Sequence, residues 1–484
     1  MALTSLYKMM KRIHILLISL VMLGITACEK YTDVTPKGAF IVETANDFYQ
    51  LAAMPNRGYP INNFQYLVDD QWMKESNVIG ITPNVNTVNF TFDETVDRVS
   101  LITGSSFYNQ AYAYINRWNT IISLVDDSKG DEKTKQLAKA EAKILRAYDH
   151  FLLVNTYAKA YDPQTAATDG GICIMDKYDL EAKPRKSTVA QVYAFIQKDI
   201  EDALPFLDVK PSDIYHPSLA FAYAFKAKVH LFKREISEAK AAAEKSLSYN
   251  NQIFDLVAYA AQGGPASVPV IAPNNPEVLS YMYMTGYNEM NFAYQYIISP
   301  ELRTLFGNND ARFNLFFNTT NASFLDIGSN TAYYNITFTR FFYPTVGMKT
   351  PEVYLMLAEC YARDNNFEEA VKILNQVRAK RILNGGTVNL AVPTTRKATM
   401  ELVVNERRKE LLLGFNRFFD LKRLNLEPEY AKTITRTFPI VNKSVPQKTY
   451  TLQPNSRLYI IPFPLNVLRM NPSLTLNTDE RIPF

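Results

Sequence analysis

The sequence predicts a mainly α-helical protein in which a scaffold of tetratricopeptide-like helical hairpins carries long, loop-rich insertions. Three observations predict this class. Apolar residues recur at intervals of three and four over several long segments, which is the period of an amphipathic helix. Two segments share one spacing of small and aromatic residues. The stretches between the helical segments are rich in Asn, Thr, Pro and Gly, which favour turns and loops.

The first element along the chain is a leader. A basic start at residues 8–12 precedes an apolar stretch at residues 13–25, which is shorter than the ~20 residues of a membrane span. These features, with small residues before a cleavage point, are typical of a secretory signal peptide. Cys28 follows directly, which is the pattern of a bacterial lipobox. We expect residues 1–27 to be removed and the Cys28 thiol to be lipidated. An ordinary signal peptide and a short anchor helix are the alternatives.

The N-terminal region, residues 28–250, begins with a short polar tether and then alternates helices with loops. Residues 55–105 lack a long apolar period, so we expect loops and short elements there. Long loops in a compact protein usually have a function. Ser187 and Thr188 stand where the cap of a helix is expected. The helices predicted before the repeated segments span residues 45–53, 106–125, 134–157 and 188–207.

Two segments carry the repeated spacing, with four positions that lie 4, 12 and 4 residues apart. Small residues at such positions let two antiparallel helices approach closely, as in a tetratricopeptide helix pair. Turn residues stand between the two halves, at 233–235 and at 363–366. Two amphipathic hairpins that match by chance are the alternative. The positions are Tyr223, Ala227, Ala239 and Ala243 in the first copy and Tyr354, Ala358, Ala370 and Leu374 in the second.

The second region, residues 251–484, starts with an aromatic-rich insertion. Residues 251–345 contain several Gly and Pro residues and no long apolar period, so we expect them to be non-helical. A helix is predicted at residues 397–413, and it opens a dense set of charged residues. We favour a structural ion-pair network over a catalytic role for this set. Its members are Glu406, Arg407, Arg408, Glu410, Arg417, Asp420 and Arg423.

The composition gives no support to several classes of function. The chain has 52 basic and 48 acidic residues, and three of the basic ones fall in the leader, so no excess of charge favours nucleic-acid binding. No HExxH, CxxC, P-loop or GxSxG motif occurs, and of the three histidines after the leader, His150, His216 and His230, the first and last fall in predicted helices far apart in sequence. We therefore assign no catalytic residue, no metal site and no cofactor. The sequence leaves open whether Cys173 and Cys360 pair.

The most specific motifs are AEAKILRA at residues 140–147, EVYLMLAE at residues 352–359, and ERRKEL followed by RFFDL within residues 406–421. These segments resemble the SusD/RagB family of outer-membrane nutrient-binding lipoproteins of Bacteroidetes-type bacteria. The resemblance spans nearly the whole chain after the leader. It implies an all-helical scaffold of tetratricopeptide-like hairpins that carries loops. It also implies a lid on a SusC-like TonB-dependent transporter, which binds oligosaccharides or peptides.

Two classes of function compete. The first is a non-enzymatic binding lipoprotein, anchored by lipid to the outer membrane and exposed at the cell surface. The second is a lipid-anchored enzyme that degrades a polymer, and the missing catalytic motifs favour the first. A glycan is the leading ligand, because aromatic rings in loops offer flat faces on which sugars stack. A peptide is the alternative ligand.

The candidate ligand contacts come from two loop-rich stretches, residues 62–92 and 281–296. In the family, the loops of this half of the protein contact the ligand. Aromatic rings would stack on the ligand, and a carboxylate would orient a hydroxyl group. The alternative is that most of these rings pack under the loops. The candidates are Asp70, Trp72, Asn89, Tyr283, Tyr287 and Tyr294.

Overall fold

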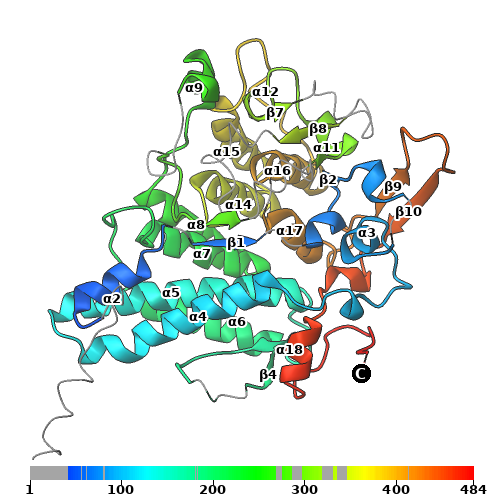
Figure 1. Ribbon diagram of the computed structural model, residues 1–484. Helices are drawn as coiled ribbons and strands as arrows, with labels where there is room; N and C mark the ends of the chain where they lie inside the picture. The colour runs from blue at the N-terminus through cyan, green and yellow to red at the C-terminus, as the bar shows by residue number, and fades with distance from the viewer. Residues whose placement is uncertain are drawn as a thin grey trace, which may run out of the picture. The chain divides into compact units, whose positions relative to one another are not determined.

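Helices account for most of the regular structure in the computed structural model, which confirms the predicted mainly α-helical class (Figure 1). Thr44–Phe484 forms one compact unit, and the chain up to Glu43 is a separate unit. The structure describes residues 42–55, 57–60, 63–79, 82–179, 181, 184–268, 275–285, 297–318, 331–334, 346–412 and 414–483.

Helix α5 is the centre of the N-terminal helices. It has 26 residues and contacts α2, α4 and α6 through a face that is buried from Leu137 onward. Asp131 caps its start, because the side chain accepts a hydrogen bond from the amide of Thr134 at 2.9 Å. Helix α6 ends at Ala203, earlier than predicted, because Pro205 has no backbone N–H with which to continue the helical hydrogen bonds. The bounds are α2 (Ala45–Ala52), α4 (Ser106–Leu124), α5 (Glu132–Tyr157) and α6 (Val189–Ala203).

A buried acid–histidine pair connects α5 to the segment before α7. The carboxylate of Glu141 lies 2.7 Å from Nδ1 of His216, and both side chains are at most 1% exposed. The ring of Tyr49, on α2, stacks on the imidazole of His216 with 3.9 Å between ring centroids. Burial raises the pKa of Glu141 from 4.5 to about 7, although the hydrogen bond with His216 opposes this shift.

Replacement of Glu141 by glutamine is expected to flatten the dependence of stability on pH. The pKa of Glu141 is higher in the folded chain than in the unfolded chain. Between pH 4.5 and about 7, Glu141 therefore binds more protons in the folded chain. The free energy of unfolding from this group therefore falls as the pH rises through that window. Urea unfolding at about pH 5 and about pH 7.5 measures the slope. Glu132→Gln changes an exposed residue of the same helix and should keep the wild-type slope. If E141Q also kept the wild-type slope, the expectation would be contradicted.

The two segments with the repeated spacing form two helical hairpins, α7–α8 and α14–α15. Arg234 and Asn365 occupy equivalent places in the two turns and adopt left-handed backbone conformations, at φ 64° and 61°. In both turns the next amide donates, at 2.9 Å, to a carbonyl five residues earlier. This is the Schellman pattern of a helix end, and it is consistent with the predicted tetratricopeptide-like pairs. The bounds are α7 (Leu219–Phe232), α8 (Ile236–Tyr249), α14 (Thr350–Arg363) and α15 (Phe367–Ala379).

Small residues of the repeated pattern lie in the core between these helices. Ala227, Ala243 and Ala358 have no exposed surface, and small side chains at a helix contact allow the axes to approach closely. Helices α8 and α14 also contact each other, so the two hairpins share one core. They lie on either side of residue 250, and the division of the chain at that residue stays a prediction.

Helices α16 and α17 complete the core on the C-terminal side. Helix α16 packs on α14 and α15, and it ends at Glu410, slightly earlier than predicted. Gly414 adopts a φ of 80° between the two helices, a conformation that glycine adopts without steric cost. Figure 1 shows α14, α15 and α16 side by side above the α7–α8 hairpin. The bounds are α16 (Arg396–Glu410) and α17 (Asn416–Leu424).

Three short α-helices in the described parts of residues 251–345 contradict the expectation that this range is non-helical. Each begins after a residue whose side chain accepts a hydrogen bond from the first turn: Asp255, Ser299 and Asp310. Each has only six residues, which is too short to show an apolar period in the sequence. The helices are α9 (Leu256–Ala261), α11 (Pro300–Leu305) and α12 (Ala311–Phe316); α3 (Val85–Phe90) and α18 (Leu465–Met470) are equally short.

Small sheets join segments that are distant in sequence. Strands β2, β6, β8 and β7 form an antiparallel sheet in that order, β1 pairs in parallel with β5, and β3–β4 and β9–β10 are antiparallel pairs. The β9–β10 hairpin extends from the body beside α3 in Figure 1. The strands are β1 (Gly58–Pro60), β2 (Gln71–Trp72), β3 (Gly170–Cys173), β4 (Lys186–Thr188), β5 (Tyr283–Thr285), β6 (Ile297–Ile298), β7 (Phe317–Asn318), β8 (Ala332–Tyr334), β9 (Ile434–Phe438) and β10 (Lys448–Leu452).

Candidate functional site

The loop-rich stretch after β1 meets the insertion at the β2–β6–β8–β7 sheet, where Trp72 lies opposite Ile297. The ring of Trp72 packs 5.5 Å from that of Phe90 and 6.2 Å from that of Phe438, between ring centroids. Tyr333 belongs to the same cluster. Because Trp72 is only 4% exposed, its ring has no free face on which a sugar could stack. This corrects the expectation that Trp72 forms an exposed platform.

The indole N–H of Trp72 is a buried donor that finds no acceptor among the described residues. Leaving such a donor unsatisfied costs ~1–3 kcal/mol. Groups of this kind are rare in native proteins, and each calls for an explanation such as a bound water or a functional role. A ligand oxygen that reached this N–H would satisfy it.

Two substitutions of Trp72 separate the N–H from the ring. Trp72→Phe keeps an aromatic ring and removes the unsatisfied donor, so the free energy of unfolding is expected to change by no more than ~1.5 kcal/mol. Trp72→Ala leaves a cavity in the cluster and is expected to lower the free energy of unfolding by ~3–5 kcal/mol. Urea unfolding measures both changes. If the phenylalanine variant were destabilised as much as the alanine variant, the N–H would have a partner and the interpretation would be wrong.

Asp70 is buried against an arginine, and so is its neighbour Asp69. Arg408 Nε donates to Asp70 Oδ1 at 2.7 Å, and Arg417 donates to both oxygens of Asp69 at 2.7 Å each. Burial raises the pKa of Asp70 and outweighs the attraction of Arg408. Burial acts in the same direction on Asp69, but Arg417 and Arg408 outweigh it and hold the pKa of Asp69 well below its usual range. Both carboxylates therefore form internal ion pairs and are not exposed to orient a ligand.

Asn89 is also internal. Its side-chain amide donates to Asn63 O at 3.2 Å, its oxygen accepts a hydrogen bond from Arg98 Nη1 at 3.3 Å, and the residue has no exposed surface. Arg98 is held in turn by Glu480 near the C-terminus, with Nε 3.0 Å from Oε1. The sequence contains no signal for this contact, because the two residues are far apart in the chain. Asn89 therefore connects the backbone at Asn63 to the side chain of Arg98 through internal hydrogen bonds.

The three candidate tyrosines come from the insertion. The backbone of Tyr283 belongs to β5, where it pairs with Gly58 of β1. The side chain of Tyr283 and the whole of Tyr287 and Tyr294 lie outside the described residues. Their contacts with a ligand stay a prediction.

A pocket of about 400 Å³ opens beside the ion pairs of Asp69 and Asp70. The buried Arg408 and the partly buried Arg417 line it, together with apolar side chains of α11, α16 and α17. Glu401 and Lys397 are exposed residues that line the same pocket. Charges of both signs could hold a polar molecule there.

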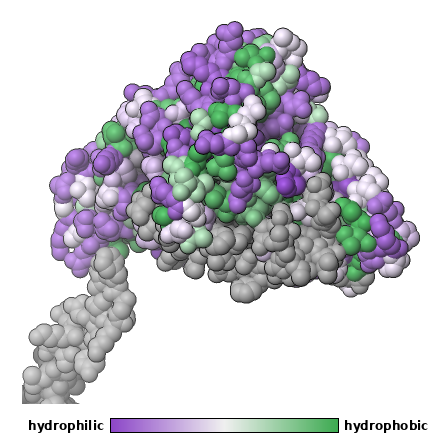
Figure 2. Space-filling model, turned by 90° about the horizontal axis from the view of Figure 1, so that it is seen from above, coloured by the Kyte–Doolittle hydropathy of each residue, from purple (hydrophilic) through white to green (hydrophobic). Residues whose placement is uncertain are grey.

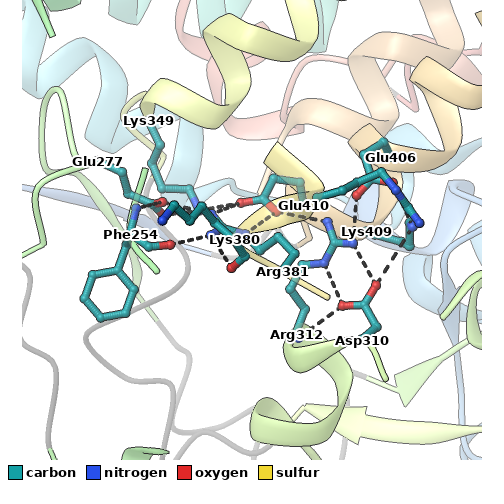
Figure 3. Close-up of polar contacts among 11 residues, drawn as sticks. Phe254, Glu277, Asp310, Arg312, Lys349, Lys380, Arg381, Glu406, Lys409 and Glu410 are labelled. Atoms are coloured by element: carbon teal, nitrogen blue, oxygen red, sulfur yellow. Dashed lines mark hydrogen bonds and ion pairs between the residues drawn. The ribbon is translucent and has the colours of Figure 1, made fainter. Parts of the chain in front are cut away.

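Two carboxylates of the charged set, Glu406 and Glu410, lie in a buried ion-pair network on α16, as predicted for the set (Figure 3). Glu410 accepts hydrogen bonds from Arg381 Nε at 2.9 Å, Arg381 Nη2 at 2.8 Å and Arg312 Nη1 at 3.0 Å. Arg312 Nη2 also lies 2.7 Å from Asp310 and 2.7 Å from Glu406. Burial would raise the pKa of Glu410, but the cations, Arg381 above all, lower it to about 2. These carboxylates neutralise buried cations, which is a structural role.

The remaining members of the set connect α16 and α17 to α14. Arg407 Nε lies 2.9 Å from Asp420, and Arg423 Nε lies 2.8 Å from the same carboxylate. Arg423 reaches Glu359 of α14 at 2.6 Å. The C-terminal motifs are thus tied to the second hairpin by charge as well as by packing.

No three His, Cys, Asp or Glu side chains gather as a metal site within the described ranges. Cys173 and Cys360 are free and buried, which answers the question of their pairing. Burial raises the pKa of Cys173 to about 11 and that of Cys360 to about 12, so both thiols stay protonated at neutral pH. Burial also lowers the pKa of His150 to about 3, which keeps its imidazole neutral.

Most of the described residues on the face that Figure 2 shows are hydrophilic. In Figure 2 the hydrophobic residues form small groups among hydrophilic ones. The large exposed apolar side chains are scattered, and Met470 is the most exposed of them at 86%. Single exposed apolar residues are ordinary on protein surfaces. Within the residues that the structure covers, no helix combines the length and the apolar character that crossing a membrane requires.

Two family models match the chain. A SusD-like model, described as starch-binding and associating with the outer membrane, matches residues 32–231. The model of the SusD family itself, SusD_RagB, matches residues 322–479. A search of curated proteins gave no match.

Solved structures share the fold. A SusD superfamily protein from Bacteroides thetaiotaomicron has a TM-score of 0.66 and 20% identity, over 90% of this chain and 98% of that one. A putative sugar binding protein from Bacteroides vulgatus has a TM-score of 0.69 and 19% identity, over 92% and 100%. A SusD superfamily protein from the same species has a TM-score of 0.69 and 19% identity, over 91% and 100%. At these identities the likeness is one of fold, and together with the two family models it shows that the chain belongs to the SusD/RagB family.

Proposed function

We propose that this protein is a non-enzymatic, lipid-anchored binding protein of the outer membrane, which captures glycans and acts as the lid of a SusC-like TonB-dependent transporter. The match of residues 32–231 to a family described as starch-binding and associating with the outer membrane carries the proposal. The name of the sugar binding protein from Bacteroides vulgatus supports a sugar ligand. Cys28, directly after the leader, supports the lipid anchor.

The proposed ligand-binding face is formed by the loops at residues 62–92 and 281–296. Tyr283, Tyr287 and Tyr294 would supply the stacking rings. Trp72 would contribute its unsatisfied N–H and not a ring face, because the ring is buried. Asp70 and Asn89 would act behind the face, through Arg408 and Arg98, by holding the loops in place.

A glycan array probed with the chain produced from Glu29 onward, without the leader and the lipidated Cys28, tests the ligand class. We expect binding to one or more oligosaccharides, followed by calorimetry on the best of them. Tyr287→Ala and Tyr294→Ala should each weaken binding by about fivefold, since an aromatic contact contributes ~1 kcal/mol. Tyr178→Ala, an exposed tyrosine outside these loops, is the matched control. Binding to peptides alone would favour the peptide alternative, and release of shorter sugars from the bound glycan would contradict a non-enzymatic role.

The lid function has its own test. A lid covers its transporter, so we expect a SusC-like protein to be recovered with this chain from membranes in mild detergent at native expression. Recovery of this chain alone under those conditions would count against the lid, while leaving glycan binding to be judged from the array.

A further inference from the structure

Arg436 of β9 inserts its side chain into the loop-rich stretch that ends at α3. Its Nη1 donates to the carbonyl oxygens of Tyr66 at 2.8 Å and Phe90 at 2.7 Å. Its Nη2 donates to those of Val68 at 2.5 Å and Gln71 at 3.3 Å. The residue is 3% exposed. One guanidinium group therefore satisfies four backbone carbonyls from separate short elements of this stretch: Tyr66 lies in a 3₁₀ turn, Gln71 in β2, Phe90 in α3, and Val68 between the first two.

The same guanidinium group lies between two aromatic rings. Its carbon is 4.4 Å from the ring centroid of Phe90 and 4.4 Å from that of Phe92. Phe92 has a φ of 52°, a left-handed conformation that bulky residues seldom adopt and that costs energy. Arg436 thus contacts the loop where its backbone is strained, which supplies interactions that offset the strain.

A second contact runs in the opposite direction, from the loop to the hairpin. The carboxylate of Glu75 accepts hydrogen bonds from the consecutive amides of Ile440, Val441 and Asn442, the last two at 2.7 and 2.6 Å. Glu75 is 1% exposed. Successive amides that point at one anion form a nest, so the turn that follows β9 is built around a carboxylate that the loop supplies.

We propose that Arg436 and Glu75 form a reciprocal clamp through which the β9–β10 hairpin positions the loop at residues 63–92 for ligand binding. Each element supplies one buried charge, and the backbone of the other element satisfies it. If either charge is lost, the groups that it satisfies on the other element lose their partner inside the protein. Both are positioning residues, since each acts on the backbone of the opposite element. The consequence for ligand binding rests on the function proposed above.

Hydrogen exchange followed by mass spectrometry tests the clamp without any ligand. Arg436→Met keeps a long unbranched side chain and removes the donors, so exchange in residues 63–92 is expected to become about tenfold faster or more. Glu75→Gln should speed exchange at residues 440–442 and, because the clamp is reciprocal, in residues 63–92 as well. The double variant should lose no more protection than the more affected single variant. Independent, additive losses, or wild-type exchange in residues 63–92 of R436M, would overturn the clamp.

Arg146→Met is the matched control, since Arg146 is a buried arginine that pairs with Asp199 at 2.7 Å between α5 and α6. It should speed exchange in those helices and leave residues 63–92 unchanged. On the glycan array, R436M should lower the signals of the wild type about tenfold, and Arg436→Lys, which keeps the charge, should restore part of the loss. Faster loop exchange with unchanged glycan signals would overturn the positioning role and leave the proposed function intact. If the wild type bound no glycan, the proposed function would fail, and the exchange data alone would decide the clamp.

Discussion

Replacement of Cys28 by alanine is expected to leave the leader attached and the protein without acyl chains. The thiol of Cys28 is the only group that the proposed lipid attachment can use at the cleavage point. Each buried CH₂ of an acyl chain contributes ~0.8 kcal/mol, and two or more chains make anchoring stable. Loss of all chains therefore removes the whole proposed anchor. Intact-mass measurement of the N-terminus and detergent phase partitioning measure the effect.

The buried cysteines supply the control for this experiment. Cys173→Ala changes a thiol that is free and buried, so this variant should keep the acyl mass and the detergent partitioning of the wild type. An unmodified N-terminus in the wild-type protein, at any residue other than Cys28, would show that the lipobox interpretation is wrong.

Replacement of Glu410 by glutamine is expected to lower the free energy of unfolding by ~3–5 kcal/mol, because it removes one charge from a buried ion-pair network. Glutamine has nearly the same shape, so no cavity forms. The buried cations Arg381 and Arg312 would keep their positions and lose a partner that now lies 2.8–3.0 Å away. Urea unfolding of the two proteins measures the difference.

Two further measurements separate this effect from an ordinary loss of charge. Glu369→Gln removes a half-exposed partner of Lys372 on α15 and should cost no more than ~1 kcal/mol. The folded-state pKa of Glu410 is about 2 against an ordinary 4.5, so its carboxylate contributes stability above pH 4.5 that is lost as the pH falls through about 2. The difference between wild type and E410Q should therefore shrink in acid. The role assigned to the network would be contradicted if the difference in the free energy of unfolding between wild type and E410Q did not change with pH. A difference no larger than that caused by E369Q would also contradict it.

Local patterns predicted the helical scaffold well. The helices at residues 106–124 and 132–157 are long, so their apolar period is unmistakable, and their bounds differ from the predicted ones by two residues or fewer. The two hairpins were visible because their small residues and their turns repeat at one spacing. The six-residue helices of the insertion were missed, because one and a half turns cannot establish a period.

The candidate site was harder to predict, because a residue type does not show whether a side chain is covered. Trp72 and Asp70 fall in a loop-rich stretch, where an exposed aromatic ring and a free carboxylate are reasonable expectations. Phe438 and Arg408 cover them, from segments more than 300 residues later in the chain. The charged set of α16, by contrast, was correctly predicted to be structural, although its partners Arg312 and Arg381 were not identified.

The sequence by itself predicted the leader with Cys28, and it determined the helical class, the repeated hairpins and the family motifs, because each is encoded by neighbouring residues. Only the tertiary structure decided which polar groups meet. The contacts of Arg436 with residues 66–90 and of Glu75 with residues 440–442 join segments that have no shared period or motif. Such contacts depend on how the core folds the chain back on itself. Burial then makes them obligatory, since a charge or an amide removed from water must find its partner inside the protein.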